Sequence, residues 1–339
     1  MDFEETGASS IRESLSVPFP ESGSPPTGTG KVLDDFWSVK DDQPFVFANG
    51  GVQSVDPGQA LFLSYPVPMI GTMTARVATP DAPGQGLETL SPSRASDFKT
   101  CPQLFKFRAI DRLPEPTTIY QARGTTAHVA LERLYDLPRG ERDPDRLFDL
   151  FRDAWTECRL DEEYGSLFES GADETAWGVE SMQLLANYFA IEDPRTIDPY
   201  QREMDMTEDL DGIVIRGILD RIDRDGDGDL VITDYKTGKA PPERYALPAF
   251  FALKIYALLI RRRTGETPKE IRLLYLNGPT LYRLAIEDSQ LDAMDSQLRA
   301  LWAAINRAIT TNSYPPKPGR LCDWCSFQNI CPAFADTGT

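Results

Sequence analysis

The chain has 339 residues, of which 41% are hydrophobic and 26% are charged, a composition typical of a globular protein with a substantial core. A formal net charge of −18 argues against a protein that binds nucleic acid through an overall basic surface. No apolar run approaches the roughly 20 residues that a membrane span needs, and the acidic, polar start lacks the basic-then-apolar pattern of a signal sequence. We therefore expect a cytoplasmic protein without a membrane partner.

The first 88 residues differ in composition from the rest of the chain. They are rich in Pro, Gly, Ser and Asp, and their short apolar pieces show no helical periodicity. We interpret residues 1–88 as a disordered or loosely structured extension, with Met73 as an alternative start of the chain. Residues 89–335 then form one folded domain.

The predicted elements follow from Ser91 onward. Ser91 is a good N-cap and Pro92 suits the first helical position, so a helix should begin there and continue past Cys101 to Arg108. Apolar periodicity predicts the later helices, and alternation predicts the strands. The helices are expected at 120–137, 145–158, 174–191, 248–263 and 289–310, and the strands around Glu203, at 217–223 and 232–236, and at 271–276 and 281–286. Helices around a mixed central sheet place the chain in the α/β class.

The segments 217–223 (GILDRID) and 232–236 (ITDYK) are joined by an Asp-Gly turn, which predicts a β-hairpin. Because alternate side chains of a strand share a face, Asp234 and Lys236 point the same way, and Asp220 can lie opposite them. Two carboxylates and an ammonium are costly to bury without partners. An oxygen-rich site of this kind suits Mg²⁺ or Mn²⁺, with the lysine beside a phosphate or a water.

This arrangement resembles the PD-(D/E)xK nuclease superfamily, whose pattern is an Asp, a spacer and then Asp/Glu-x-Lys, here Asp220 and the segment 234–236. The longer pattern, G-x-x-D-R-I-D followed by D-Y-K-T-G, is similar to the RecB-type exonucleases, including the CRISPR-associated iron–sulfur exonucleases. The resemblance covers about residues 90–335 and implies a restriction-endonuclease-like core with a helical N-terminal part. It also implies a metal-dependent DNA exonuclease acting on single-stranded ends, with partners among recombination, repair or CRISPR-adaptation proteins.

The resemblance assigns roles to individual residues. His128, within GTTAHVALE, matches a metal-ligating histidine of the family, so the metal ligands would be His128, Asp220, Asp234 and the main-chain carbonyl of Tyr235. The bound Mg²⁺ or Mn²⁺ would lower the pKa of an attacking water. Lys236 would position that water or stabilise charge on the phosphate.

Two further residues are catalytic candidates by the same resemblance. Glu203 lies on the strand before G-x-x-D, where relatives often carry a glutamate beside the metal. Tyr256 matches the tyrosine of a Gln-x-x-x-Tyr motif on the helix after D-x-K, but Ala252 occupies the glutamine position. This departure implies weaker catalysis without the loss of a metal ligand.

The five cysteines indicate metal or cluster binding rather than disulfides in a protein expected to be cytoplasmic. The C-terminal pattern C-x-x-C-x5-C together with an upstream cysteine is compatible with zinc. The resemblance favours a 4Fe–4S cluster, for which four thiolates are the usual ligand set. Its ligands would be Cys101, Cys322, Cys325 and Cys331, which leaves Cys158 as a buried spare thiol.

Two other functions remain open. One is a catalytically weak DNA-binding module of a repair or adaptation complex, in keeping with Ala252 and the acidic charge. The other is a calcium-binding protein, because the segment Asp223–Asp234 fits most of an EF-hand loop. The flanks of that segment alternate like strands, and its twelfth position is Asp instead of the usual Glu, so we interpret its aspartates as solvated hairpin residues.

Contact with DNA would require a local basic strip, because the chain as a whole is acidic. Arginines near the first helices and at the end of the 248–263 helix are candidates for phosphate contacts, and two aromatic residues are candidates for stacking on bases. These residues are Arg108, Arg112, Arg123, the run 261–263, Phe107 and Tyr120.

Overall fold

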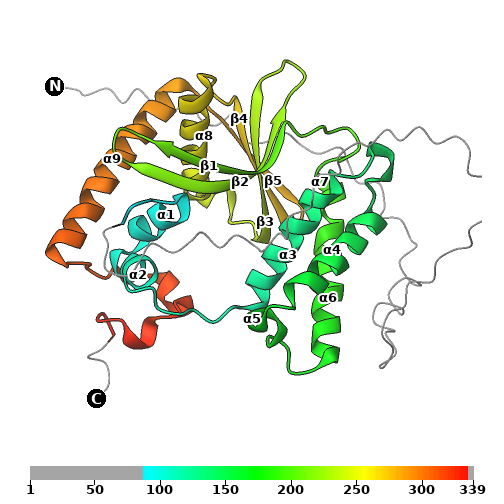
Figure 1. Ribbon diagram of the computed structural model, residues 1–339, viewed down its shortest axis with the longest axis horizontal. Helices are drawn as coiled ribbons and strands as arrows, with labels where there is room; N and C mark the ends of the chain where they lie inside the picture. The colour runs from blue at the N-terminus through cyan, green and yellow to red at the C-terminus, as the bar shows by residue number, and fades with distance from the viewer. Residues whose placement is uncertain (1–86, 335–339) are drawn as a thin grey trace, which may run out of the picture. The chain divides into compact units, whose positions relative to one another are not determined.

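The computed structural model describes residues 87–334. The extension expected over residues 1–88 and the alternative start at Met73 lie outside the described residues, apart from the last two positions of the extension. The described chain is built around one five-stranded sheet with strand order β1–β2–β3–β4–β5 (Figure 1). The strands are β1 (Gln201–Asp209), β2 (Val214–Arg224), β3 (Leu230–Lys239), β4 (Glu270–Asn277) and β5 (Thr280–Ala285).

The sheet is mixed, as predicted. β1, β2 and β3 form an antiparallel meander, β3 and β4 pair in parallel, and β4 and β5 form an antiparallel hairpin. A parallel pair needs a crossover connection, which α8 (Phe251–Thr264) supplies here. The α/β class and the predicted hairpin are therefore confirmed.

Helices surround the sheet in two groups (Figure 1). α3 to α7 lie together to the right of the sheet, while α1, α8 and α9 lie at its other side. Within residues 87–334, no helix is both long and apolar enough to cross a membrane. Besides α8, the helices are α1 (Pro92–Thr100), α2 (Pro102–Phe105), α3 (Ile119–Leu134), α4 (Pro144–Cys158), α5 (Glu162–Gly165), α6 (Gly171–Ala186), α7 (Tyr188–Ile191) and α9 (Asp288–Thr311).

The expected first helix does not continue through Cys101. Ser91 caps α1 through its side chain as predicted, but α1 ends at Thr100, and Cys101 is extended at φ −156° and ψ 112°. Pro102 explains the break, because a proline disfavours the helical conformation of the residue before it. The chain then re-enters a short helix and a π-helical turn, Lys106–Ile110. The break matters because Cys101 is one of the predicted cluster ligands.

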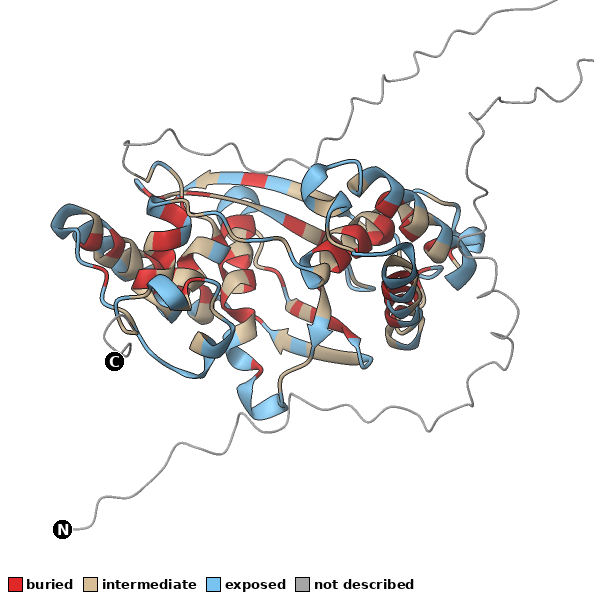
Figure 2. Cartoon of the chain, turned by 90° about the horizontal axis from the view of Figure 1, so that it is seen from below, coloured by how far each residue is buried: buried red, intermediate tan, exposed pale blue. Residues whose placement is uncertain are grey.

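The main hydrophobic core lies between the sheet and the helices α1, α8 and α9 (Figure 2). Ile222 of β2, Ile232 of β3, Leu259 of α8 and Leu298 of α9 are all buried members of it. Side chains alternate along a strand, so residues 220 and 234 share a face with Ile222 and Ile232 respectively. The candidate carboxylates therefore lie on the face that α8 covers.

Candidate active site

The β2–β3 hairpin brings Asp220, Asp234 and Lys236 together. Arg221 pairs with Thr233 and the register continues toward the hairpin's open end, which places Asp220 opposite Asp234. Lys236 Nζ lies 2.5 Å from Oδ2 of Asp234. The backbone N–H of Tyr235 donates to Oδ2 of Asp220 over 2.9 Å.

His128 reaches this group from α3. Its Nδ1 lies 3.4 Å from Oδ1 of Asp220, and its Nε2 lies 3.0 Å from the carbonyl oxygen of Tyr235. Both ring nitrogens therefore face oxygen acceptors, which favours the imidazolium form. Burial by itself lowers the pKa of His128, but the negative charge of Asp220 and, more weakly, of Asp234 and Glu203 raises this pKa to about 9.

Glu203 completes a compact set of possible metal ligands. One donor atom from each of His128, Glu203 and Asp220 lies within 4.8 Å of the others. Glu203 has φ +42°, an uncommon conformation for a residue other than glycine, so the backbone of β1 is locally strained where it presents this carboxylate. Burial and the charge of Asp220 raise the pKa of Glu203 to about 7.

The carboxylates of this site repel one another. Burial and then the charge of Asp220 raise the pKa of Asp234. Burial also opposes ionisation of Asp220, but the charge of His128 and hydrogen bonds from His128 and the Tyr235 backbone hold the pKa of Asp220 below its ordinary value. Oδ2 of Asp234 is buried and accepts no hydrogen bond from the described residues, although the Lys236 ammonium lies close to it. Oxygen and imidazole donors around an unsatisfied buried carboxylate fit a divalent cation.

The glycine of the G-x-x-D pattern makes room for Tyr256. A Cβ atom added at Gly217 would lie 2.3 Å from the Tyr256 hydroxyl oxygen, well inside van der Waals contact. β2 and α8 therefore approach each other closely at this point only because residue 217 has no side chain. The contact fixes the ring of Tyr256 beside the strand that carries Asp220.

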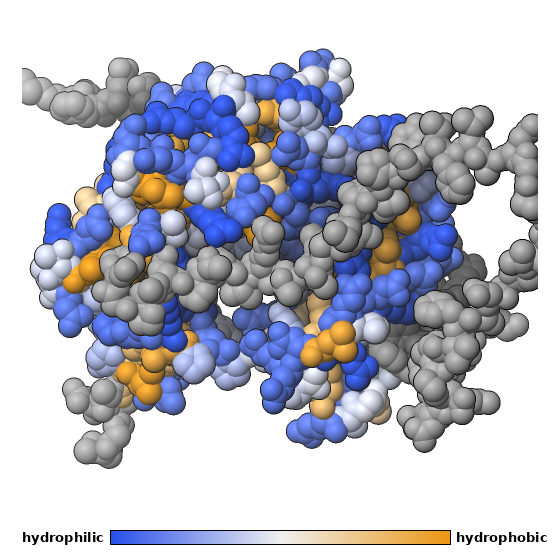
Figure 3. All heavy atoms as spheres, in the orientation of Figure 1, coloured by the Kyte–Doolittle hydropathy of each residue, from blue (hydrophilic) through white to orange (hydrophobic). Residues whose placement is uncertain are grey.

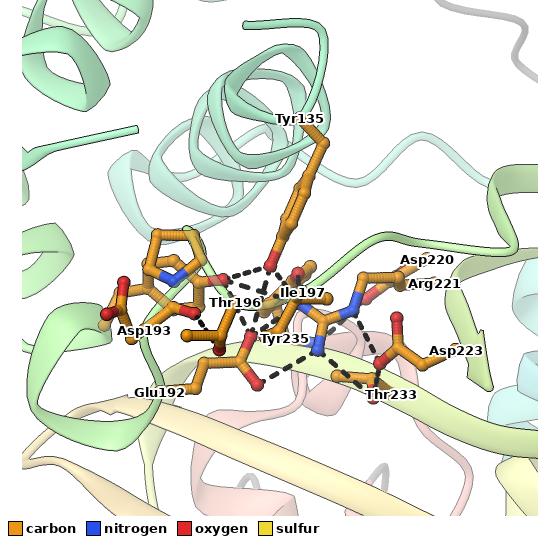
Figure 4. Close-up of polar contacts among 12 residues, drawn as sticks. Tyr135, Glu192, Asp193, Thr196, Ile197, Asp220, Arg221, Asp223, Thr233 and Tyr235 are labelled. Atoms are coloured by element: carbon orange, nitrogen blue, oxygen red, sulfur yellow. Dashed lines mark hydrogen bonds and ion pairs between the residues drawn. The ribbon is translucent and has the colours of Figure 1, made fainter. Parts of the chain in front are cut away.

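A buried arginine network lies on the opposite face of the hairpin, and the sequence analysis missed it (Figure 4). Arg221 is only 1% exposed and forms an ion pair with Glu192, Nη1 to Oε1 at 2.5 Å, and with Asp223, Nε to Oδ2 at 3.0 Å. Its Nη1 also donates to the hydroxyl of Tyr135 over 2.7 Å and to that of Tyr235.

This network joins the hairpin to the helical part. Tyr135 follows α3, Glu192 follows α7, and Arg221 and Tyr235 lie on β2 and β3. Asp223, interpreted from the sequence as a solvated turn residue, is instead buried and bonded to Arg221 and Thr233. No local pattern in the sequence marks this network, because β2 carries other charged residues beside Arg221, among them Asp220 and Arg224.

The other aspartates of the hairpin turn surround a lysine. Nζ of Lys269 lies 3.0, 3.2 and 2.9 Å from carboxylate oxygens of Asp225, Asp227 and Asp229. The segment lies between two strands, and Asp223 faces Arg221, so neither the flanks nor the ligands of an EF-hand are present. The geometry argues against the calcium-binding alternative, because the Lys269 ammonium lies among these carboxylates and offsets part of their charge.

The four cysteines of the expected cluster line one cavity of about 260 Å³ between the α1–α2 junction and the C-terminal segment. They are Cys101, Cys322, Cys325 and Cys331, and all are free thiols. The backbone N–H of Lys317 lies 3.4 Å from the sulfur of Cys101, and that of Gly319 lies 3.4 Å from the sulfur of Cys322. Cys158 does not line this cavity and is half-buried, not buried as expected; it lies on α4 against Thr126.

The C-terminal segment has little hydrophobic burial of its own. Its two short 3₁₀ turns, Arg320–Trp324 and Gln328–Ile330, contain no buried residue, and Phe327 between them is buried against Phe107. Figure 3 shows hydrophobic surface at the lower left, over this segment. Leu321, Trp324 and Ile330 are among its exposed apolar side chains. Apart from Phe327, few hydrophobic contacts therefore hold these two turns in place.

Several residues proposed for DNA contact serve internal interactions. Arg108 pairs with Asp97 and Glu115, and Arg123 is buried against Glu180 and Ser181. Phe107 packs on Phe327 and is buried, whereas Tyr120 is 71% exposed at the start of α3. The run 261–263 pairs with Asp288, Asp292, Asp211 and Glu208.

Comparison with known proteins identifies the family. A crystal structure described as "Putative exonuclease" from Eubacterium rectale is 15% identical, with a TM-score of 0.45, over 70% of this chain and 87% of that one. The crystal structure of SSO0001 is 12% identical, with a TM-score of 0.36, over 74% of this chain and 88% of that one. No curated protein matches. The profile of the PD-(D/E)XK nuclease superfamily matches residues 89–332. With its mixed sheet flanked by helices, a restriction-endonuclease-like core, the chain belongs to the PD-(D/E)XK nuclease superfamily.

Proposed function

We propose that the protein is a metal-dependent DNA exonuclease that acts on single-stranded ends. The observation that carries this proposal is the convergence of His128, Glu203 and Asp220 beside Asp234 and Lys236 in a member of a nuclease superfamily. This donor set combines metal ligands with Lys236, a partly exposed cation that pairs with Asp234.

The residues that would hold Mg²⁺ or Mn²⁺ are His128, Asp220, Asp234 and the carbonyl of Tyr235, with Glu203 as a neighbouring carboxylate. A bound ion would lower the pKa of a water molecule and offset negative charge on the phosphate. The positive charge would also remove the repulsion that now raises the pKa of Asp234 and Glu203. His128 must lose a proton before it can bind the ion through a ring nitrogen.

Lys236 stabilises the negative charge that develops on the phosphate. Burial lowers the pKa of Lys236, but the charges of Asp234 and Asp220 outweigh that effect and raise it, so the side chain is an ammonium at neutral pH. An ammonium in a partly enclosed site interacts with a phosphate oxygen more strongly than it would in water. Tyr256 of α8, which is held against Gly217, would keep β2 and the site residues in position.

The test uses three labelled substrates with Mn²⁺: linear single-stranded DNA, linear duplex, and a covalently closed single-stranded circle. We expect progressive digestion of the linear single strand and an intact circle. Cleavage of the circle at a comparable rate would overturn the exonuclease assignment. Lys236→Ala serves as the control that assigns any digestion to this site.

We further propose that Cys101, Cys322, Cys325 and Cys331 hold a 4Fe–4S cluster. Four free thiols around one cavity, with two backbone N–H groups directed at sulfurs, fit a thiolate-ligated cluster. Anaerobically purified protein should be brown and contain iron and sulfide in about a 1:1 ratio. Stoichiometric zinc in place of iron would decide for the zinc alternative.

A second candidate function is a catalytically weak DNA-binding module of a recombination, repair or CRISPR-adaptation complex. Ala252 favours it, because the Gln-x-x-x-Tyr motif that this segment resembles has a glutamine here, whereas alanine offers no polar group one turn before Tyr256. Single-stranded DNA binding without digestion under Mn²⁺ would support the module over the enzyme.

A further inference from the structure

A buried glutamine without a hydrogen-bonding partner lies at the cavity of the four cysteines. Gln103 of α2 is only 7% exposed, and it is one of the residues that line this cavity. Among residues 87–334, no hydrogen bond involves its side-chain amide. An amide enclosed in this way loses hydrogen bonds to water, so a polar group bound in the cavity would replace them.

The position of Gln103 follows from the break in the chain at Cys101. α2 begins at Pro102, so Gln103 lies in its first turn, two residues after a cysteine that lines the same cavity. The C-terminal segment, which carries the other three cysteines, forms the opposite wall beside α2 (Figure 1). Because Gln103 and Cys101 belong to one short stretch of chain, a group bound at the Cys101 sulfur stays close to Gln103.

The rest of the cavity lining also suits a negatively charged centre. The chain has 53 acidic residues, yet none of the described ones lines this cavity, whereas Lys317 and Arg320 do. Two backbone N–H groups, those of Lys317 and Gly319, each lie 3.4 Å from a cysteine sulfur. Four thiolates carry more negative charge than an iron–sulfide core or a zinc ion offsets, so hydrogen-bond donors directed at the sulfurs stabilise the centre.

Gln103 adds a side-chain donor to these two backbone donors. Resting on the proposed cluster, we propose that the amide N–H of Gln103 donates a hydrogen bond to a sulfur of the centre that the four cysteines hold. A hydrogen bond to sulfur strengthens as the centre becomes more negative, so it favours the reduced state of a cluster and raises its reduction potential. Gln103 thus sets how readily the cluster is reduced and how firmly the centre is retained.

The test compares anaerobically purified wild type with Gln103→Met, which keeps an unbranched side chain of similar length but removes both N–H donors. The equilibrium constant for one-electron reduction, from a titration followed by electron paramagnetic resonance, should fall about tenfold, which is about 59 mV in reduction potential. Loss of the visible absorbance to an iron chelator should be several-fold faster. Gln103→Glu should lower the potential further, because its negative charge opposes the added electron.

Gln328→Met is the matched control. Gln328 lines the same cavity but is only half-buried, so water can hydrogen-bond to its amide. This variant should keep the reduction potential and the rate of cluster loss close to those of wild type.

Two results would overturn the proposal. One is a wild-type potential and rate of cluster loss in both Gln103 variants, and the other is an equal change in Gln103→Met and Gln328→Met, which would report the polarity of the lining alone. Metal analysis of wild type tests the cluster separately. Stoichiometric zinc would defeat the cluster, and faster zinc release to a chelator from Gln103→Met than from Gln328→Met would then support the hydrogen bond, whereas equal release would overturn it. Wild type without iron or zinc would defeat both proposals.

Discussion

Nη1 of Arg221 donates a hydrogen bond to the Tyr135 hydroxyl over 2.7 Å, and Tyr135 directly follows the helix that carries His128. α3 therefore meets the β2–β3 hairpin at two points, through His128 at Asp220 and through Tyr135 at Arg221. Asp220 and Arg221 are neighbours whose side chains lie on opposite faces of β2. The buried network fixes the end of α3, and so fixes where His128 meets the carboxylates.

Substitutions of Arg221 and Tyr135 in this buried network should lower the free energy of unfolding more than the substitution of an exposed arginine does. Arg221→Met leaves Glu192 and Asp223 buried without a cation, so the free energy of unfolding should fall by about 3–5 kcal/mol. Tyr135→Phe removes the hydroxyl that accepts from Arg221 and is hydrogen-bonded to the Tyr188 hydroxyl, so it should cost about 2 kcal/mol. Arg224→Met, at an exposed pair with Glu266, should change little. Urea titrations of the metal-free proteins measure all three.

A positioning role for this network requires a second readout. Tyr135→Phe should weaken Mn²⁺ binding, measured by calorimetry, because His128 is held less firmly. The Arg224→Met protein is the control and should bind Mn²⁺ as wild type does. Unchanged Mn²⁺ affinity in Tyr135→Phe would restrict the network to a stabilising role.

Substitutions at the hairpin should separate metal binding from chemistry. Asp220→Ala and Asp234→Ala each remove a carboxylate, so both should weaken Mn²⁺ binding and abolish digestion. Lys236→Ala should lower the rate by about 10² to 10³ while Mn²⁺ binds as well or more tightly, because a like charge near the ion is gone. Lys239→Ala, exposed at the end of the same strand, is the matched control. Wild-type digestion by Lys236→Ala would remove the lysine from the mechanism.

His128 makes the stability of the metal-free protein depend on pH. Its pKa is about 9 in the folded protein, above the ordinary value of 6.5, so the folded state holds a proton that the unfolded state releases between those values. The stabilisation is complete below pH 6.5 and is lost as the pH rises through 9, by up to roughly 3 kcal/mol. Urea titrations in EDTA should show this decline, and His128→Gln should flatten it. A decline that persists in His128→Gln would place the titrating group elsewhere.

The cysteine cavity should be structural. Cys101 and Cys331 lie near opposite ends of the described chain, so a shared cluster closes a very long loop and constrains the unfolded chain. Cys325→Ala should therefore lose both solubility and visible absorbance. Cys158→Ala, on α4, should keep both. Equal losses in the two proteins would mean that the ligand set is wrong.

The hairpin and its carboxylates were predictable because alternation fixes which side chains share a face. That rule placed Asp220, Asp234 and Lys236 together without any knowledge of the fold. The approach of His128 was expected only from family resemblance, since its contact with the Tyr235 carbonyl depends on how α3 packs on β3. Long-range packing leaves no local pattern in a sequence.

Other features were missed for identifiable reasons. The break at Cys101 follows from Pro102, a local rule that the apolar periodicity of the segment outweighed in the prediction. The burial of Arg221 and Asp223 could not be seen locally, because their partner Glu192 comes from another part of the chain. The positive φ of Glu203 is a strain that only the assembled site makes necessary.

Because Gly217 and Tyr256 are in contact, the residue that the protein accepts at position 217 depends on the residue at position 256. Any side chain at 217 collides with the phenol, so Gly217→Ala in an otherwise wild-type gene should score as a loss of function. The Cβ atom of the new alanine would meet the Tyr256 hydroxyl first, and two atoms of the ring would lie 2.9 and 3.0 Å from it. Tyr256→Phe therefore relieves part of the collision, and a smaller residue relieves all of it. Selection for restored folding from a Gly217→Ala library should therefore return second-site suppressors at codon 256.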